Sequence, residues 1–473
     1  MTLPAPGWRR DLLLALLLAL AAAALRLPRL GFPPEEVFDE VYHAKTALQY
    51  LNGEPPTEWV HPPTAKLLIA IGIWKFGYVS WAWRLLPALA GIALAPVFFL
   101  LARRVLPSER AALFASFLLL CDGVYMVQSR VAMTNIFAVL FQVSSALFIV
   151  RAGRREGVPL WDMLAAGVCL GLALSTRWTS LWAAGFLGLT LVAVRARRLL
   201  RWSELLLVLL AFAIIPALIY VLSYVPWMEQ GHTVRDMVQL QSSIWHYHAT
   251  LNATHPYFSK WYTWPWLVRP TWYYFNNQDG WVRGMVAIGN PAIWWASVPV
   301  SLWALLTSFR ARRPALDLAA VACAAAGGAL LVTADAVAVL GALLMLASVA
   351  LILIAQHTLL DPVRLFTGAG FFALYLPWGV SPRTLNYSHY LFEAIPYACL
   401  SLGLLLDRLW GLRERSPKRA ILGETAVVAY LSLVLALFIL FFPLLTALPV
   451  PARWFNEPVF FGVRPWTWFR SWI

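Results

Sequence analysis

The sequence contains little charge. Charged residues make up only 13% of its 473 residues, whereas hydrophobic residues make up 61%. Soluble domains carry roughly 25% charged residues, so this chain has too little polar surface to solvate a folded globule. The shortage excludes soluble globular, disordered and nucleic-acid-binding proteins. The net charge of +14 is explained instead by short basic clusters between apolar runs, which orient a protein in a membrane.

Cysteine is scarce as well. The four cysteines show no close pairing and fall in or beside apolar segments, at Cys121, Cys169, Cys323 and Cys399. This spacing disfavours a disulfide framework and a thiolate metal site. We interpret the four residues as small hydrophobic side chains buried in the protein.

Long apolar runs dominate the chain. Windows of about 20 apolar residues predict about 13 transmembrane helices, with a range of 11 to 13. The predicted spans are 11–27, 81–102, 111–128, 131–150, 160–176, 178–194, 204–224, 290–309, 315–333, 336–355, 365–379, 389–407 and 421–445. We divide the chain into an N-terminal transmembrane region (1–224) with a first outer loop (28–80), a long aromatic outer loop (225–289), a C-terminal transmembrane region (290–446) and an outer aromatic tail (447–473).

Basic residues predict the orientation of these spans. With the N-terminus in the cytoplasm, the clusters in short loops alternate correctly at every crossing. The cytoplasmic clusters then comprise Arg9, Arg10 and basic residues within 103–110, 151–155, 195–201, 310–313, 364 and 408–419. We therefore predict a multi-pass protein of the inner (plasma) membrane, with its N-terminus in the cytoplasm and its C-terminus and functional site facing outward.

The first outer loop is predicted to hold an interfacial helix with an acidic pair. Prolines near the start and a glycine at the end predict an amphipathic helix over 33–53. On that helix Asp39 and His43, at positions i and i+4, share one face, while Glu40 points about 100° away. Two interpretations stay open, because the carboxylates either carry chemistry or solvate the polar face of the helix.

A second short helix is predicted to begin within HPPTAK (61–66). Lys66 either snorkels to lipid head groups or holds an anionic head group. An ammonium group near a low-dielectric surface attracts phosphate strongly.

Several segments, taken in order, resemble the protein O-mannosyltransferase family. They are FDEVYHAK (38–45), HPPTAKLL (61–68), WRLLPALAG (83–91), DGVYMVQSRVAM (122–133), LSTRWTSLW (174–182), WHYHATLNATHPYFSKWYTWPWLVRPTWYY (245–274), GNPAIWW (289–295) and PRTLNYSHYLFEAIP (382–396). The resemblance covers residues 10 to 445. Asn135 departs from the Asp usual in the family, and Arg177 replaces a common Lys, which keeps the charge but changes its geometry.

The resemblance implies a fold and a function. The implied fold is an all-α polytopic membrane protein, a GT-C-like helical bundle with interfacial helices in the first outer loop. Because residues 226–289 are too few for one, no soluble MIR domain is expected, as in compact bacterial members. Family members transfer mannose from a polyprenyl-phosphate carrier to Ser or Thr hydroxyls of secreted proteins, with inversion at the anomeric carbon. An enzyme of this kind is expected here.

Such a transfer needs a base for the acceptor proton and cations for the phosphate leaving group. The resemblance implies that Asp39 and Glu40 are catalytic, and it leaves open which of them accepts the proton. Four cations near predicted outer helix ends are expected to bind donor phosphate or lipid, namely Lys66, Arg130, Arg177 and Arg383. Six side chains are expected to contact substrate, namely His43, His61, His246, His248, His389 and Tyr390.

The implied partners are polyprenyl-phosphate-linked mannose, secreted acceptor polypeptides and the lipid membrane, without nucleic acid. Association with the secretion machinery stays open. A metal site at His246, His248 and His255 is disfavoured, because no cysteine or carboxylate is near in sequence and the family resemblance implies metal-independent or only loosely metal-dependent transfer. No cofactor is assigned, and a divalent cation stays open without being predicted.

Three alternatives remain at this point. A transferase of the same fold could place a lipid-linked sugar on a lipid or glycan. A polyprenyl-sugar flippase or transporter predicts charges in the middle of helices, whereas nearly all ionisable residues here fall at span ends. A non-catalytic partner subunit is disfavoured by the intact Asp39–Glu40 pair.

Overall fold

The fold is mostly helical. The computed structural model describes residues 7–195, 198, 201–310, 359–411, 417–458 and 464–472, with a few single positions between 319 and 347. The predicted spans 315–333 and 336–355 lie outside the described residues. The division of the chain at 224, 289 and 446 stays a prediction.

Helices cover the other predicted spans. They are α1 (Trp8–Arg26), α4 (Ser80–Val105), α5 (Glu109–Leu120), α6 (Gly123–Gln128), α7 (Asn135–Arg154), α8 (Leu160–Leu174), α9 (Ser180–Arg195), α10 (Trp202–Leu209), η1 (Leu210–Ile214), α11 (Ile215–Ser223), α14 (Pro291–Ser308), α17 (Pro362–Tyr375), α18 (Ile395–Trp410) and α19 (Pro417–Thr446). Among the described residues, four helical segments are long and apolar enough to cross a membrane: 80–105, 135–154, 202–223 and 420–446. The total number of spans stays a prediction.

Shorter elements connect these helices. They are α2 (Glu40–Asn52), α3 (Thr64–Phe76), α12 (Val225–Met228), α13 (Val234–Thr250), η2 (Trp261–Thr263), β1 (Thr271–Gln278), β2 (Trp281–Ala287), β3 (Phe309–Arg310), β4 (Leu359–Leu360), η4 (Leu376–Gly379), η5 (Ser388–Glu393), β5 (Val450–Pro451), α20 (Ala452–Asn456) and η7 (Arg470–Trp472).

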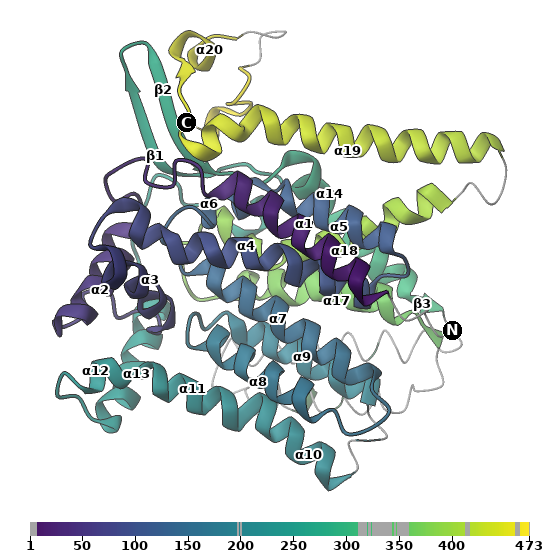
Figure 1. The fold of residues 1–473 in the computed structure, drawn as a ribbon, viewed down its shortest axis with the longest axis horizontal. Helices are drawn as coiled ribbons and strands as arrows, with labels where there is room; N and C mark the ends of the chain where they lie inside the picture. Colours follow the sequence, from purple (N-terminus) through teal and green to yellow (C-terminus); the bar gives the residue numbers. More distant parts are fainter. Residues whose placement is uncertain are drawn as a thin grey trace.

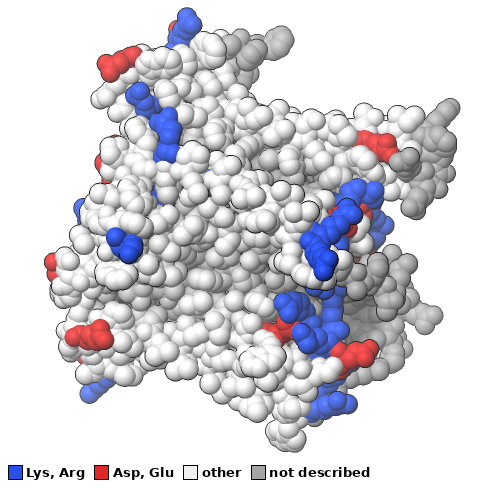
Figure 2. Space-filling view, in the orientation of Figure 1, with Lys and Arg blue, Asp and Glu red and all other residues white. Residues whose placement is uncertain are grey.

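The predicted outer loops gather at one end of the bundle. Figure 1 shows α2, α3, α12 and α13 at the end opposite the N-terminus, with the β1–β2 hairpin projecting beside them. The core between the two ends is formed by α7 packed on α4 and α8, and by α18 packed on α5 and α14. On the face drawn in Figure 2, the densest groups of Lys and Arg lie at the end that carries the N-terminus.

The all-α prediction is wrong in the long outer loop. β1 and β2 pair antiparallel, and β5 extends them to a three-stranded sheet. The turn residues Asp279 (φ 54°) and Gly280 (φ 75°) both have positive φ, as a type I′ hairpin turn requires. An Asp-Gly pair between aromatic and β-branched residues is a strong hairpin signal, and this signal was in the sequence.

The predicted start of the first interfacial helix is also wrong. The helix α2 begins at Glu40, not at Pro33, and Asp39 occupies its N-cap position. The residues before it cannot join the helix because Arg84 binds the carbonyl oxygens of Leu30 (3.3 Å), Pro33 (2.7 Å) and Glu35 (3.0 Å). The predicted end is correct, since Gly53 caps the helix with a φ of 69°, a conformation that glycine adopts readily.

Candidate active site

A buried ion pair fixes the start of α2. Arg84 donates from Nε to Glu40 Oε1 (2.8 Å) and from Nη2 to Glu40 Oε2 (2.7 Å), and both side chains are fully buried. The Glu40 carboxylate also accepts the backbone N–H groups of Val37 (3.0 Å) and Ala132 (2.9 Å). Because the protein itself occupies its oxygens, Glu40 is suited to brace the loop.

The backbone conformation and the packing of Phe38 orient the next residue, Asp39. Its φ of 50° lies in the left-handed region, which costs a bulky side chain energy and persists only when packing enforces it. The ring stacks on Tyr273 (4.4 Å between centroids) and meets the edges of His255, Tyr387 and His389 at 5.7–6.1 Å. This aromatic box therefore sets the direction in which Asp39 leaves the backbone.

Asp39 carries an unengaged carboxylate. It is partly exposed, and no described residue donates a hydrogen bond to it or forms an ion pair with it. Desolvation, with a contribution from the Glu58 carboxylate, raises its pKa to about 6 against the opposing effects of Arg383 and Arg177. A carboxylate with a raised pKa is a stronger base than a free one and is still ionised near neutral pH.

Two guanidinium groups converge on one tyrosine near Asp39. The guanidinium carbons of Arg177 and Arg383 lie 5.1 Å and 5.9 Å from the ring centroid of Tyr390. Arg177 Nη1 binds Thr134 Oγ1 (3.3 Å) and Asn135 Oδ1, whereas Arg383 binds Leu385 O (2.8 Å) through Nε. Within the described part of the chain, the Nη2 groups of both arginines have no hydrogen-bond acceptor. They are therefore free to bind an anion.

Glu393 positions Arg177. This buried carboxylate accepts Thr179 Oγ1 (2.7 Å) and Gln142 Nε2 (3.0 Å), and it lies 3.5 Å from Arg177 Nε. The Nε group itself makes no hydrogen bond of ordinary geometry. Glu393 therefore compensates part of the buried charge of Arg177 and leaves the far side of its guanidinium open.

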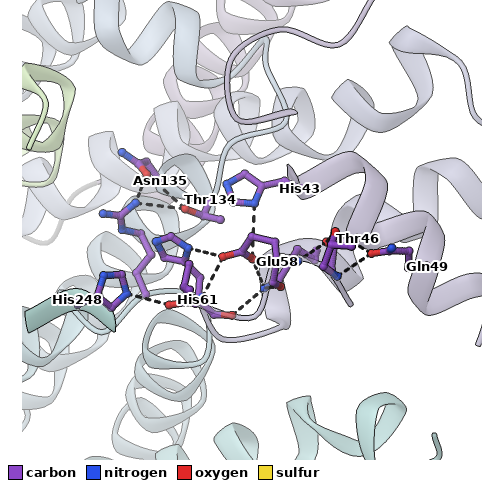
Figure 3. A network of polar contacts seen from close by, with 12 residues as sticks. His43, Thr46, Gln49, Glu58, His61, Thr134, Asn135 and His248 are labelled. Carbon is purple, nitrogen blue, oxygen red and sulfur yellow. Dashed lines mark hydrogen bonds and ion pairs between the residues drawn. The ribbon is translucent and has the colours of Figure 1, made fainter. Parts of the chain in front are cut away.

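A second polar network surrounds Glu58 (Figure 3). Glu58 Oε1 accepts from His61 Nδ1 (2.7 Å), its Oε2 lies 3.9 Å from His43 Nδ1, and Lys66 Nζ binds the same carboxylate. Burial opposes ionisation of Glu58, but Lys66 and His61 hold its pKa well below its usual range. Burial also lowers the pKa of His43 to about 4 and that of His61 to about 3. Both rings are therefore neutral beside an ionised carboxylate.

Two of the predicted phosphate-binding cations are occupied by the protein. Besides the Glu58 carboxylate, Lys66 Nζ binds the carbonyl oxygens of Glu58 (3.0 Å) and His61 (2.7 Å), which uses all three of its N–H groups. Arg130 is buried and binds three carbonyl oxygens at and just after the end of α1, those of residues 26, 28 and 29. In this geometry Lys66 has no N–H group left for a phosphate, and Arg130 keeps a buried Nε group without a partner.

Of the predicted histidines, His246 lies apart from the others. His61 lies between His43 and His248. Its ring centroid is 6.0 Å from that of His43 and 5.5 Å from that of His248. His248 Nδ1 accepts from Arg383 Nη1 (2.9 Å), so its proton is on Nε2, which donates to Val60 O (2.9 Å). His246 is exposed on α13, and positions i and i+2 of a helix point about 200° apart. His246 and His248 therefore cannot share a ligand sphere.

His389 and Tyr390 both lie in the site. The His389 ring is 4.9 Å from that of Tyr390 and stacks on Tyr387 at 5.5 Å. The structure thus brings together Asp39, Arg177, Arg383, His248, His389 and Tyr390, with His43 and His61 in the adjoining network. Among the described residues, no group of three or more His, Cys, Asp or Glu side chains has an arrangement that could hold a metal ion.

Two buried carboxylates were not predicted as site residues. Glu58 lies three residues before His61, and Glu393 is the acidic residue of the segment PRTLNYSHYLFEAIP (382–396). Both were within quoted or neighbouring segments. The available signal was an acidic residue within or next to a segment that also carries a cation. The sequence alone does not show that these carboxylates are buried or which cations are near them.

Two family models together match most of the chain. Residues 16–80 and 74–230 match the family described as dolichyl-phosphate-mannose-protein mannosyltransferase, and residues 233–472 match the C-terminal four-transmembrane region of protein O-mannosyltransferase. The polyprenol-phosphate-mannose–protein mannosyltransferase of Corynebacterium glutamicum is 30% identical over 87% of this chain and 81% of its own. The protein of the same name from Mycolicibacterium smegmatis is 28% identical over 99% of this chain and 93% of its own.

Solved structures share the fold. A chain of the S. cerevisiae protein O-mannosyltransferase complex bound to its sugar donor matches with a TM-score of 0.72 at 14% identity, covering 94% of this chain and 92% of that one. ArnT from Cupriavidus metallidurans bound to undecaprenyl phosphate matches with a TM-score of 0.50 at 17% identity, over 94% and 77%. The resemblance predicted from the motifs is confirmed, and the chain belongs to the protein O-mannosyltransferase family of membrane-embedded glycosyltransferases.

Proposed function

We propose that this protein transfers mannose from polyprenyl-phosphate-mannose to Ser or Thr hydroxyls of secreted polypeptides on the outer face of the membrane. The observation that carries the proposal is the unengaged Asp39 carboxylate beside the two partly free guanidinium groups of Arg177 and Arg383. A sugar transfer from a phosphate carrier needs a base for the acceptor proton and an anion site for the leaving phosphate. The names of the bacterial relatives support the same donor and acceptor.

The chemical step follows from these roles. The acceptor hydroxyl oxygen attacks the anomeric carbon of mannose while its proton passes to the Asp39 carboxylate. The bond between the anomeric carbon and the phosphate oxygen breaks, and polyprenyl phosphate leaves with the bonding electron pair. Arg177 and Arg383 stabilise the charge that grows on that phosphate. Direct displacement with a single base inverts the anomeric carbon.

Purified protein in liposomes tests this function. We expect labelled mannose to move from polyprenyl-phosphate-mannose to a Ser- and Thr-containing peptide, with the inverted anomer in the product. In secreted proteins from a deletion strain, mass spectrometry should show that Ser or Thr residues have lost a hexose. Transfer to lipid or glycan acceptors only, with none to peptide, would replace protein as the acceptor in this proposal.

The outward orientation of the site has its own test. The grouping of basic side chains at the end that carries the N-terminus supports a cytoplasmic N-terminus, because positive residues favour that side. A cysteine introduced at the exposed position Ser242 of α13 is expected to react with an impermeant thiol reagent in intact cells. Its control is Gly157→Cys in the loop between α7 and α8, which should react only after permeabilisation. The opposite result at the two positions would reverse the orientation.

Arg177 is expected to control use of the donor. Arg177→Ala should raise the donor KM about tenfold to a hundredfold, since hydrogen bonds to charged groups contribute about 1.5–3 kcal/mol. Arg177→Lys should retain part of this affinity, because the charge persists although the forked geometry is lost. Arg235→Ala, which removes an exposed cation of α13, serves as the matched control and should change little. An unchanged donor KM in both Arg177 variants would remove Arg177 from the donor site.

A further inference from the structure

An open groove on the surface lies close to the candidate active site. It has a volume of about 480 Å³ and is lined by Trp59, Ser242, Ser243, His246, Tyr247 and Thr250. All but Trp59 lie along one face of α13, and Trp59 belongs to the loop that carries Glu58 and His61. A volume of this size is within the range of ligand pockets, roughly 300–1,000 Å³.

One wall of this cavity is shared with the site. The Tyr247 ring meets the edge of Trp59 on one side (5.7 Å) and the edge of His248 on the other (5.5 Å). His248 in turn binds Arg383. His248 therefore lies between the Tyr247 wall of the cavity and Arg383.

The lining chemistry indicates what the cavity can bind. Among the described residues that line it there is no Lys, Arg, Asp or Glu, so a phosphate finds no counter-charge. Three hydroxyl groups interrupt the two aromatic rings, so the wall offers no continuous apolar surface for a polyprenyl chain. Hydroxyl and imidazole groups both donate and accept hydrogen bonds, and this suits the alternating N–H and C=O groups of an extended polypeptide.

The hydroxyls are available for such bonds. The Ser242 hydroxyl has no hydrogen-bond partner within the described part of the chain, and those of Ser243 and Thr250 donate only to carbonyl oxygens of their own helix, at 3.4 Å and 2.7 Å. The faces of Trp59 and Tyr247 add surface on which proline or aliphatic side chains can pack. Cation-free hydroxyl and aromatic walls distinguish this cavity from the arginine-lined site beside it.

We propose that this cavity, the acceptor groove, binds the uncharged polypeptide segment that flanks the target Ser or Thr. The proposal rests on the proposed function, because it supplies the second substrate of the same reaction. The donor occupies the side of Arg177 and Arg383, and the acceptor approaches Asp39 past Tyr247 and His248. The residues of the acceptor groove then set the affinity for the acceptor without taking part in the chemical step.

A bulky substitution in the acceptor groove tests this assignment. Ser242→Trp, at an exposed position that tolerates substitution, is expected to raise the KM for a Ser- and Thr-containing peptide by about tenfold or more, which corresponds to a clear loss of affinity. The donor KM and the slow hydrolysis of donor by water should stay at the parent values. Val238→Trp is the matched control, because Val238 is exposed on the same helix but does not line the groove. An unchanged peptide KM in Ser242→Trp, or an equal rise in the donor KM, would overturn the proposal.

A binding measurement separates this proposal from the proposed function. In the Ser242→Cys variant, the peptide is expected to slow modification of the new cysteine by a thiol reagent, and polyprenyl phosphate is not. This protection needs no catalysis, so it tests the acceptor groove even if the protein transfers no mannose. Protection by polyprenyl phosphate, or no protection by peptide at saturating concentration, would assign the cavity elsewhere.

Discussion

Replacing Asp39 with asparagine is expected to lower mannosyl transfer about 10²- to 10⁴-fold, the usual effect of losing a general base. The amide keeps the size and shape of the side chain but cannot take up the acceptor proton. Because no described residue bonds the Asp39 carboxylate, the substitution breaks no internal contact. Protein level and binding of polyprenyl phosphate should therefore stay near those of the parent. The measurements are turnover in membranes at saturating donor and peptide, and carrier binding in parallel.

The pH profile gives an independent readout of the same residue. With the pKa of Asp39 raised to about 6, kcat/KM of the parent should fall as the pH drops through 6, because the protonated acid no longer acts as a base. The residual activity of Asp39→Asn should lack this dependence. Retained turnover in Asp39→Asn together with lost turnover per folded molecule in Glu40→Gln would move the base to Glu40. Retained turnover in both variants would contradict the mechanism.

The sequence predicts well those features that depend on local pattern. Apolar runs placed helices such as α4 and α7, and the family motifs gave Asp39 and Glu40 as candidate catalytic residues. The start of α2 was missed because it is set by Arg84, which lies 44 residues after Glu40 in the chain. The hairpin at 271–287 was missed although its Asp-Gly turn was readable, because residues 225–289 were predicted only as a long aromatic outer loop.

The roles of the individual cations could not be predicted from the sequence in the same way. Lys66, Arg130 and Arg177 all follow or precede apolar segments, and their sequence environments are alike. What separates them is the number of N–H groups left free, and this depends on carbonyl and carboxylate partners that only the fold brings near. Glu393 lies beside Arg177 although more than two hundred residues separate them in the chain, whereas Glu58, which binds Lys66, precedes it by only 8 residues. Packing, not residue type, decides which cation keeps N–H groups free.

Glu40→Gln is expected to destabilise the protein by about 3–5 kcal/mol, the typical cost of removing one partner of a buried ion pair. Arg84 would remain fully buried and charged without its counter-charge. The glutamine amide would also present N–H groups where the carboxylate now accepts the backbone N–H of Val37 or Ala132. The loop from residue 30 to Asp39 is anchored through this pair, so the base should lose its position when the pair is lost. The effect is measured by thermal unfolding in detergent, with the fraction of protein that stays monodisperse as the readout.

Glu35→Gln provides the matched control for this prediction. Glu35 is an exposed carboxylate of the same loop, and only its backbone carbonyl, which the substitution keeps, binds Arg84. Its stability and turnover should equal those of the parent. If Glu40→Gln unfolds at the same temperature as Glu35→Gln yet loses turnover, Glu40 acts on the substrate and not on the loop. If Glu40→Gln loses stability while its folded fraction still transfers mannose, proton acceptance belongs to Asp39, and the adjacent carboxylates have divided their roles between chemistry and anchoring.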